Sequence, residues 1–222
     1  MQGQRRANAT NGWKADGCVR GCSAALQLLW GVAMSVFEYV FSLYSLLLGL
    51  ALAHLLNGLA KVVEARGQVR LGWPTALLAL LMMSSLTIFW EIAWRARDAV
   101  PDNSAALFAS LIICSLLYFA SILVLPSDAA QRRDLDEHFF TAKGKVLACL
   151  LLANILAYGC RYALIGWRTF AYFSWADWLE LSLFLAGCGA GVLVTARKPI
   201  IAILALLIFL NLIDPVSTML ES

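Results

Sequence analysis

The stretch from Phe37 to Val63, FEYVFSLYSLLLGLALAHLLNGLAKVV, decides the fold class. It is an almost unbroken apolar run. A helix rises about 1.5 Å per residue, so a helix of this length crosses the roughly 30 Å hydrocarbon core of a bilayer. Polar side chains interrupt the run at Glu38, and again at His54, Asn57 and Lys61. The stretch predicts a transmembrane helix that carries polar groups in need of an explanation.

The composition extends this prediction to the whole chain. Hydrophobic residues make up 61% of the 222 residues and charged residues 14%, whereas soluble domains have about 45–50% and about 25%. We therefore expect an all-α polytopic membrane protein with about six transmembrane helices in one bundle. The lipid bilayer is its first partner, and a cell membrane of the bacterial inner-membrane type is the predicted location. The further apolar runs are 73–94, 104–125, 145–165, 177–196 and 200–213.

The domain organisation follows from where these runs begin. Residues 34–222 form the predicted six-span transmembrane domain. Residues 1–33 are polar and rich in Arg, Gly and Ala, without a clean cleavage site for a signal peptide. This segment is predicted to be a leader, either disordered or a short amphipathic helix. An alternative is that translation starts at Met34.

Lysine and arginine in the connections predict the orientation, because they favour the cytoplasmic side. The connections after the first, third and fifth spans carry nine of them: Lys61, Arg66, Arg70, Arg132, Arg133, Lys143, Lys145, Arg197 and Lys198. Those after the second and fourth carry four: Arg95, Arg97, Arg161 and Arg168. A chain that starts at Met34 would place both termini outside, whereas the basic residues of the leader would weaken the asymmetry. The longest connection, 127–142, is predicted to be a short surface helix or a solvated loop with His138 exposed.

The polar residues of the first span fall on two stripes at 100° per residue. Glu38 lies on one stripe, and His54, Asn57 and Lys61 lie on a nearly opposite one. Histidine changes charge near neutral pH, so the second stripe is either a face that handles protons or a ligand, or a packing face on which His54 bonds to a neighbouring helix. In the second span Glu91 and Arg95 form an i, i+4 pair in the favourable order.

Further charged residues mark the ends of the later spans. Asn154, Tyr158 and Arg161 share one stripe of the fourth span, and Asp177 and Glu180 open the fifth, where acids are favoured electrostatically. Odd-numbered spans begin, and even-numbered spans end, at the same membrane face. Topology therefore predicts a charged cluster at one face, consisting of Glu38, Glu91, Arg95, Arg161, Asp177, Glu180 and Asp214.

Small residues suggest close helix packing at Gly187 and Gly191, which form a Gly-x3-Gly pattern facing another helix or another subunit. The sequence contains no zinc-protease, nucleophile-elbow or phosphate-loop motif. No metal or cofactor is predicted, no tract for binding nucleic acid is present, and the balance is against an enzyme.

The predicted function is a transporter or channel for a small solute or ion. The charged cluster would line one end of its pathway, and His54 and Asn57 would lie deeper. The alternative is a non-transporting membrane subunit, scaffold or sensor that acts through helix packing with partners. A homo-oligomer is compatible with both functions.

Overall fold

In a computed structural model of the protein, the described residues are helical almost throughout. These residues are 36–65, 72–97, 104–125, 136–166, 170 and 173–220. They form six helices, α2 (Val36–Glu64), α3 (Trp73–Arg95), α4 (Ser104–Val124), α5 (Asp136–Ile165), α6 (Trp175–Leu193) and α7 (Arg197–Leu220). The predicted leader, residues 1–33, lies outside the described residues.

Five of these helices, α2 to α6, are long and apolar enough to cross a membrane. Their outward faces carry large apolar side chains, including Leu46, Phe108 and Leu193, which are 68%, 63% and 81% exposed. Water would disfavour so much exposed apolar surface, whereas lipid would not. The protein is therefore an integral membrane protein with an all-helical architecture. A sixth span at α7 remains a prediction.

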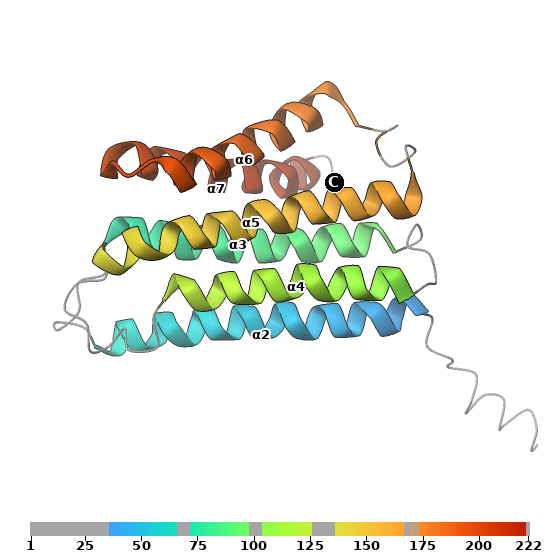
Figure 1. Cartoon of the computed structure of the whole chain (residues 1–222), viewed down its shortest axis with the longest axis horizontal. Coiled ribbons are helices and arrows are strands. Elements are labelled where there is room, and N and C mark those ends of the chain that lie inside the picture. Colours follow the sequence, from blue (N-terminus) through green and yellow to red (C-terminus); the bar gives the residue numbers. More distant parts are fainter. Residues whose placement is uncertain are drawn as a thin grey trace, which may run out of the picture. The chain divides into compact units, whose positions relative to one another are not determined.

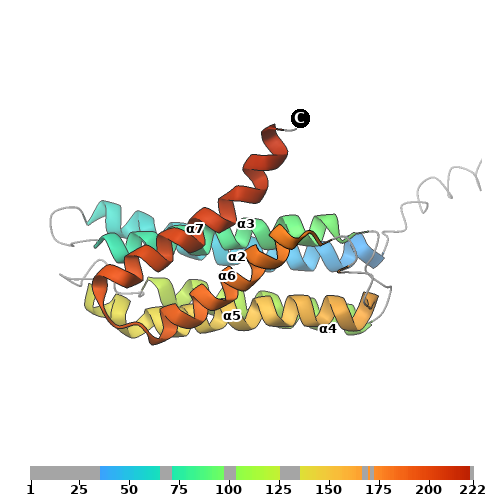
Figure 2. The ribbon, with the colours of Figure 1, turned by 90° about the horizontal axis from the view of Figure 1, so that it is seen from above.

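Consecutive helices run antiparallel, so α2 and α4 run in the same direction (Figure 1). Helix α5 contacts α3, α4 and α6, and α7 contacts α3 and α6. Two hydrogen bonds join α2 to its neighbours. The hydroxyl of Tyr44 donates to the Phe89 carbonyl of α3 at 3.0 Å, and the Cys114 thiol of α4 donates to the Tyr44 carbonyl at 3.9 Å. Figure 2 shows α6 and α7 close together at the connection between them and splayed apart towards the other end.

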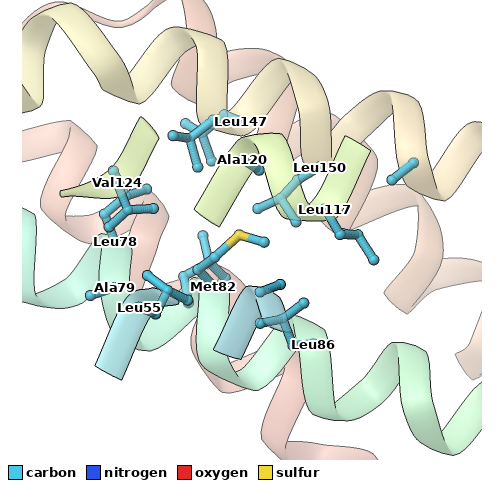
Figure 3. Close-up of a cluster of buried hydrophobic side chains, with 14 of the residues drawn as sticks. Leu55, Leu78, Ala79, Met82, Leu86, Leu117, Ala120, Val124, Leu147 and Leu150 are labelled. Atoms are coloured by element: carbon cyan, nitrogen blue, oxygen red, sulfur yellow. The ribbon is translucent and has the colours of Figure 1, made fainter. Parts of the chain in front are cut away.

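The core is an apolar cluster to which all six helices contribute, and Figure 3 shows part of it. Leu55 of α2, Met82 of α3, Leu117 of α4 and Leu150 of α5 are all completely buried in it. Inside a bilayer such contacts stabilise the bundle mainly through van der Waals packing, because lipid tails are as apolar as leucine.

The predicted start of the fourth span, about Lys145, is wrong, because α5 already begins at Asp136. His138 is only partly exposed and its Nε2 lies 3.1 Å from the Leu123 carbonyl at the end of α4. The expectation of an exposed His138 is therefore also wrong. Phe139 is the physical reason: its side chain is completely buried and holds the first turns of α5 against the core.

Lys143 was predicted to be one of the basic residues in the connection after the third span. Its side chain is 3% exposed, and its ammonium donates to the carbonyls of Gly191 at 3.0 Å and Val194 at 2.7 Å. These carbonyls belong to the C-terminal end of α6, where the last turn lacks partners within the helix. Lys143 is thus a buried cap for α6 and not a solvated loop cation.

Candidate functional site

One face of α3 carries Ser85, Phe89, Ile92 and Arg95, which lie on neighbouring turns because a helix repeats every 3.6 residues. Similar stripes come from α5, with Asn154, Tyr158 and Arg161 in order, and from the beginning of α6. The sequence therefore places a stripe that contains polar side chains on one side of each of these apolar helices.

These stripes line a partly open cavity of about 390 Å³, which we call the polar cavity. It lies between α3, α5, α6 and α7, where α6 and α7 splay apart (Figure 2). Four members of the predicted charged cluster line it: Arg95, Arg161, Asp177 and Glu180. The other described lining residues are Ser85, Ile88, Phe89, Ile92, Asn154, Tyr158, Phe173, Leu181, Phe184 and Asn211.

The lining has two levels along the bundle axis. Arg95 and Arg161 lie near the C-terminal ends of α3 and α5, and Asp177 and Glu180 lie near the start of the antiparallel α6. We call these four residues the charged tier. Ser85 precedes Arg95 by nearly three turns, roughly 15 Å, and Asn154 precedes Arg161 by about two turns, roughly 10 Å. Together with Asn211, which bonds to Ser85, they form the neutral tier deeper in the bundle.

In the charged tier, Arg95 is paired within its own helix. Its guanidinium donates to the Glu91 carboxylate at 2.6 Å, which is the predicted i, i+4 ion pair. The Nε atom of Arg161 is buried from solvent, and the Arg161 side chain as a whole is half-buried. A charged group at the centre of a bilayer costs about 2.5–3.5 kcal/mol by insertion scales, so such groups gather where polar neighbours or water reach them.

Asp177 has a second role that the sequence already signalled. Ser174 is the N-cap of α6, and its backbone N–H donates to the Asp177 carboxylate at 2.7 Å, while the N–H of Ala176 donates to the Ser174 hydroxyl at 3.5 Å. This is a capping box of the Ser-x-x-acid type, whereas only an acidic first turn was predicted from the sequence. The cap fixes the position of the Asp177 carboxylate, and Asp177 lines the polar cavity.

The neutral tier is held by hydrogen bonds between α3 and α7. The Asn211 amide nitrogen donates to the hydroxyl oxygens of Ser84 at 3.1 Å and Ser85 at 3.0 Å. On α5 the Asn154 amide nitrogen donates to the Leu150 carbonyl at 2.9 Å. Neither asparagine was among the predicted site residues. The stripe that links Asn154 to Arg161 was the signal in the sequence that could have added the first of them.

Aromatic side chains from the α5–α6 connection border the charged tier. Phe173, which lines the cavity, has its ring centroid 6.3 Å from that of Tyr158 and 5.5 Å from that of Trp178. The ring centroid of Phe170 lies 5.3 Å from the ring centroids of both Phe173 and Trp178. Aromatic side chains are typical of the membrane interface. The polar cavity therefore has its charged tier at an aromatic-rich end of the helices.

Four predicted residues are not among the described lining of this cavity. Glu91 faces a separate, largely apolar cavity between α2 and α3, beside Trp90 and Trp94. Glu38 is exposed in the first turn of α2. His54 stacks edge-on against Tyr118 of α4 at 6.5 Å, and Asn57 is exposed. Glu91 thus lies on a different face of α3, and His54 and Asn57 lie on α2, which contributes no described residue to the polar cavity. The side chain of Asp214 lies outside the described residues.

Gly187 and Gly191 lie at close contacts within this chain. A Cβ atom at Gly187 would lie 2.8 Å from Leu207 of α7, and one at Gly191 would lie 2.6 Å from Leu147 of α5. The absence of side chains at both positions allows α6 to approach its two neighbours closely. This contact lies beyond the neutral tier, away from the charged tier.

No group of three His, Cys, Asp or Glu residues suited to a metal ion occurs in the part of the chain that the structure describes. No family model matches the chain, and no curated protein and no solved structure does either. The proposed function is therefore based on the residues of the polar cavity.

Proposed function

We propose that the protein is a transporter of a small polar solute and that the polar cavity is its solute-binding site. The observation that carries this proposal is the convergence of polar side chains from four helices on one cavity inside an otherwise apolar bundle. Its volume of about 390 Å³ falls in the range of small-molecule sites, about 300–1,000 Å³.

The chemistry of the lining supports a solute site over a purely structural network. Charged and polar residues within a bundle commonly mark pathways for ions or solutes, because burying them without such a use costs free energy. Here both signs of charge are present, together with two asparagines, a serine and a tyrosine. A solute could exchange its hydration shell for these groups.

The packing beyond the cavity favours a transporter over a continuously open channel. Met82 of α3, Leu147 and Leu150 of α5, and Leu207 of α7 are all completely buried on the side away from the charged tier. A polar solute cannot pass this layer as it is packed. Transport would therefore need a second conformation in which α6 and α7 move relative to α3 and α5. Assembly into a homo-oligomer and location in a bacterial inner membrane remain predictions.

The test is uptake of a panel of small cations, anions and zwitterions into sealed proteoliposomes. We expect Arg161→Ala to lower the uptake of the transported solute at least tenfold, because it removes a charge from the cavity wall. Arg197→Ala is the matched control, since Arg197 is exposed in the first turn of α7. Both variants should elute as the wild type does in size-exclusion chromatography. Normal uptake by a folded Arg161→Ala protein would contradict the proposal, and a wild type without any uptake would favour the non-transporting subunit.

A further inference from the structure

We infer that the neutral tier binds an uncharged solute through a primary carboxamide group. The inference combines three observations. The orientation of two asparagine amides is set by their partners, which leaves two carbonyl oxygens as acceptors. A serine hydroxyl beside them supplies a donor. The three residues of the neutral tier are uncharged, and apolar side chains line the same cavity.

The orientation of the Asn211 amide follows from Ser84. The Ser84 hydroxyl donates its proton to the Leu81 carbonyl at 2.9 Å. Its oxygen can therefore only accept from Asn211, so the group that faces it at 3.1 Å must be the amide nitrogen. The carbonyl oxygen Oδ1 of Asn211 is left as an acceptor on a residue that is 8% exposed and lines the cavity.

The Asn154 amide is oriented in the same way. Its partner at 2.9 Å is the backbone carbonyl of Leu150, which can only accept, so the nitrogen must face it. The Oδ1 atom of Asn154 is then the second acceptor at this level of the cavity. No donor from the described part of the chain occupies either Oδ1 atom. A ligand that matches this tier must therefore supply at least two polar hydrogens.

Ser85 adds a donor to these two acceptors. Its oxygen accepts from the Asn211 amide nitrogen at 3.0 Å. Its own proton makes no hydrogen bond within the described part of the chain. Ser85 is only 2% exposed and lines the cavity, so this proton is available to a molecule that occupies the cavity. The matching ligand therefore also carries an acceptor.

A primary carboxamide complements all three groups. Its two N–H groups can donate to the two asparagine Oδ1 atoms, and its carbonyl oxygen can accept from the Ser85 hydroxyl. A site built in this way discriminates strongly against an analogue without N–H groups, because the buried acceptors would then lose their partners.

The depth of the neutral tier favours an uncharged ligand. Ser85, Asn154 and Asn211 are all neutral, and Asn154 lies roughly 10 Å along α5 from Arg161. An ion at this depth in a bilayer needs a partner of opposite charge or water, and the neutral tier offers only dipoles. The charged tier contains two basic and two acidic residues, so it has no excess of either sign. The selection therefore depends on the neutral groups alone.

The apolar lining accommodates the rest of the solute. Ile88 of α3, and Leu181 and Phe184 of α6, line the same cavity. Its volume of about 390 Å³ is many times the roughly 30 Å³ of one water molecule. A short alkyl chain attached to the carboxamide would fill part of this space and contact these side chains.

The inference rests on the proposed function only in taking the polar cavity as the solute site, so binding and transport are measured separately. Binding of butyramide to the full-length protein in lipid nanodiscs is measured by isothermal titration calorimetry, with empty nanodiscs as the background. One comparison ligand is N,N-dimethylbutyramide, which keeps the carbonyl group but has no N–H donor. The other is n-butylammonium, which has N–H donors but is charged. We expect both to bind at least tenfold more weakly than butyramide. Equal or tighter binding of either one would overturn the inference.

Variants test the asparagines directly. Asn154→Leu should weaken butyramide binding at least tenfold and reduce the difference in affinity between the two amides, because one acceptor is lost. Asn57→Leu, on the exposed face of α2, should bind as the wild type does. If Asn154→Leu does not fold, Asn154→Ala takes its place. Unchanged butyramide binding by the folded variant would overturn the assignment.

Uptake separates this inference from the proposed function. Butyramide is added to the uptake panel, and its entry into proteoliposomes is compared with its entry into protein-free liposomes. Butyramide binding without protein-dependent uptake would support the carboxamide site and contradict transport. Uptake of another solute without butyramide binding would support transport and overturn the carboxamide site.

Discussion

At the scale of single residues, the structure distinguishes polar side chains that serve the cavity from those that serve the fold. Arg161 and Glu180 line the polar cavity, whereas His138 and Lys143 bond to backbone carbonyls at helix ends. These roles look alike in the sequence, because each residue is a charged or titratable group near the end of an apolar run. The two roles differ in where the side chain lies in the bundle and in which group it bonds to.

The N-cap of α6 gives a prediction at this scale. Ser174→Ala removes the side chain that accepts from the Ala176 N–H, and loss of such a cap typically costs about 0.5–2 kcal/mol of unfolding free energy. Ser182→Ala is the control, because Ser182 is also exposed on α6 but bonds within the helix to the Leu179 carbonyl. Unfolding in mixed micelles measures the difference. Equal stabilities of the two variants would show that the cap contributes nothing.

Lys143 gives a second prediction. Lys143→Met keeps much of the side-chain volume but removes both donors to the end of α6, so we expect a loss of about 1.5–3 kcal/mol, the range for hydrogen bonds to charged groups. Lys145→Met, two positions along and exposed, should leave the unfolding free energy within about 0.5 kcal/mol of the wild type. Hydrogen exchange should also become faster near Val194 in Lys143→Met alone. A stable Lys143→Met protein with unchanged exchange would contradict the capping role.

At the scale of elements, α6 contributes to the polar cavity at one end of the bundle and to close helix packing at the other. Its first turns carry Asp177 and Glu180 into the polar cavity, and its last turns pack through Gly187 and Gly191 against α7 and α5. The close contact at one end and the splay at the other favour α6 as the element that would move in the proposed transport cycle.

The three glycines at the end of α6 test this packing. Alanine in place of Gly189, where a Cβ meets nothing within 4 Å, should stabilise the helix by about 0.5–1 kcal/mol. Gly191→Ala gains the same propensity but forces its Cβ to 2.6 Å from the Leu147 side chain, and overpacking costs about 1–3 kcal/mol. We therefore expect Gly191→Ala to be the less stable variant by micelle unfolding. The reverse order would mean that the α5–α6 contact adapts freely.

At the scale of the whole molecule, we expect the polar cavity to open at the end of the charged tier, because completely buried side chains such as Met82 and Leu150 pack beyond the neutral tier. Thiol labelling in sealed vesicles checks this asymmetry, in a protein whose native cysteines are replaced by serine or alanine. We expect Tyr158→Cys to react with a charged methanethiosulfonate reagent from one side of the membrane only. Leu150→Cys should not react from either side, because Leu150 is completely buried. Labelling of Leu150→Cys from both sides would indicate a continuous pore.

The sequence by itself determined the membrane class, the helical architecture and the bounds of most helices. Runs such as Phe37–Val63 reach across a bilayer only as helices, since lipid offers no partners for backbone N–H and C=O groups. It also determined that Arg95, Arg161, Asp177 and Glu180 belong to one end of the bundle, because antiparallel helices alternate their ends. The early start of α5 was missed, since nothing local distinguishes a buried Phe139 from an exposed one.

Only the tertiary structure decided which polar groups meet. Glu91 and Arg95 are adjacent on one helix, yet they face different cavities, because which way a stripe points depends on the rotation of the helix against its neighbours. Asn211 reaches Ser85 across more than half of the chain, a contact that no spacing rule could predict. The length of a helix and the residue at which it ends follow from the sequence. The direction in which each polar stripe points follows from how the helices pack in the bundle.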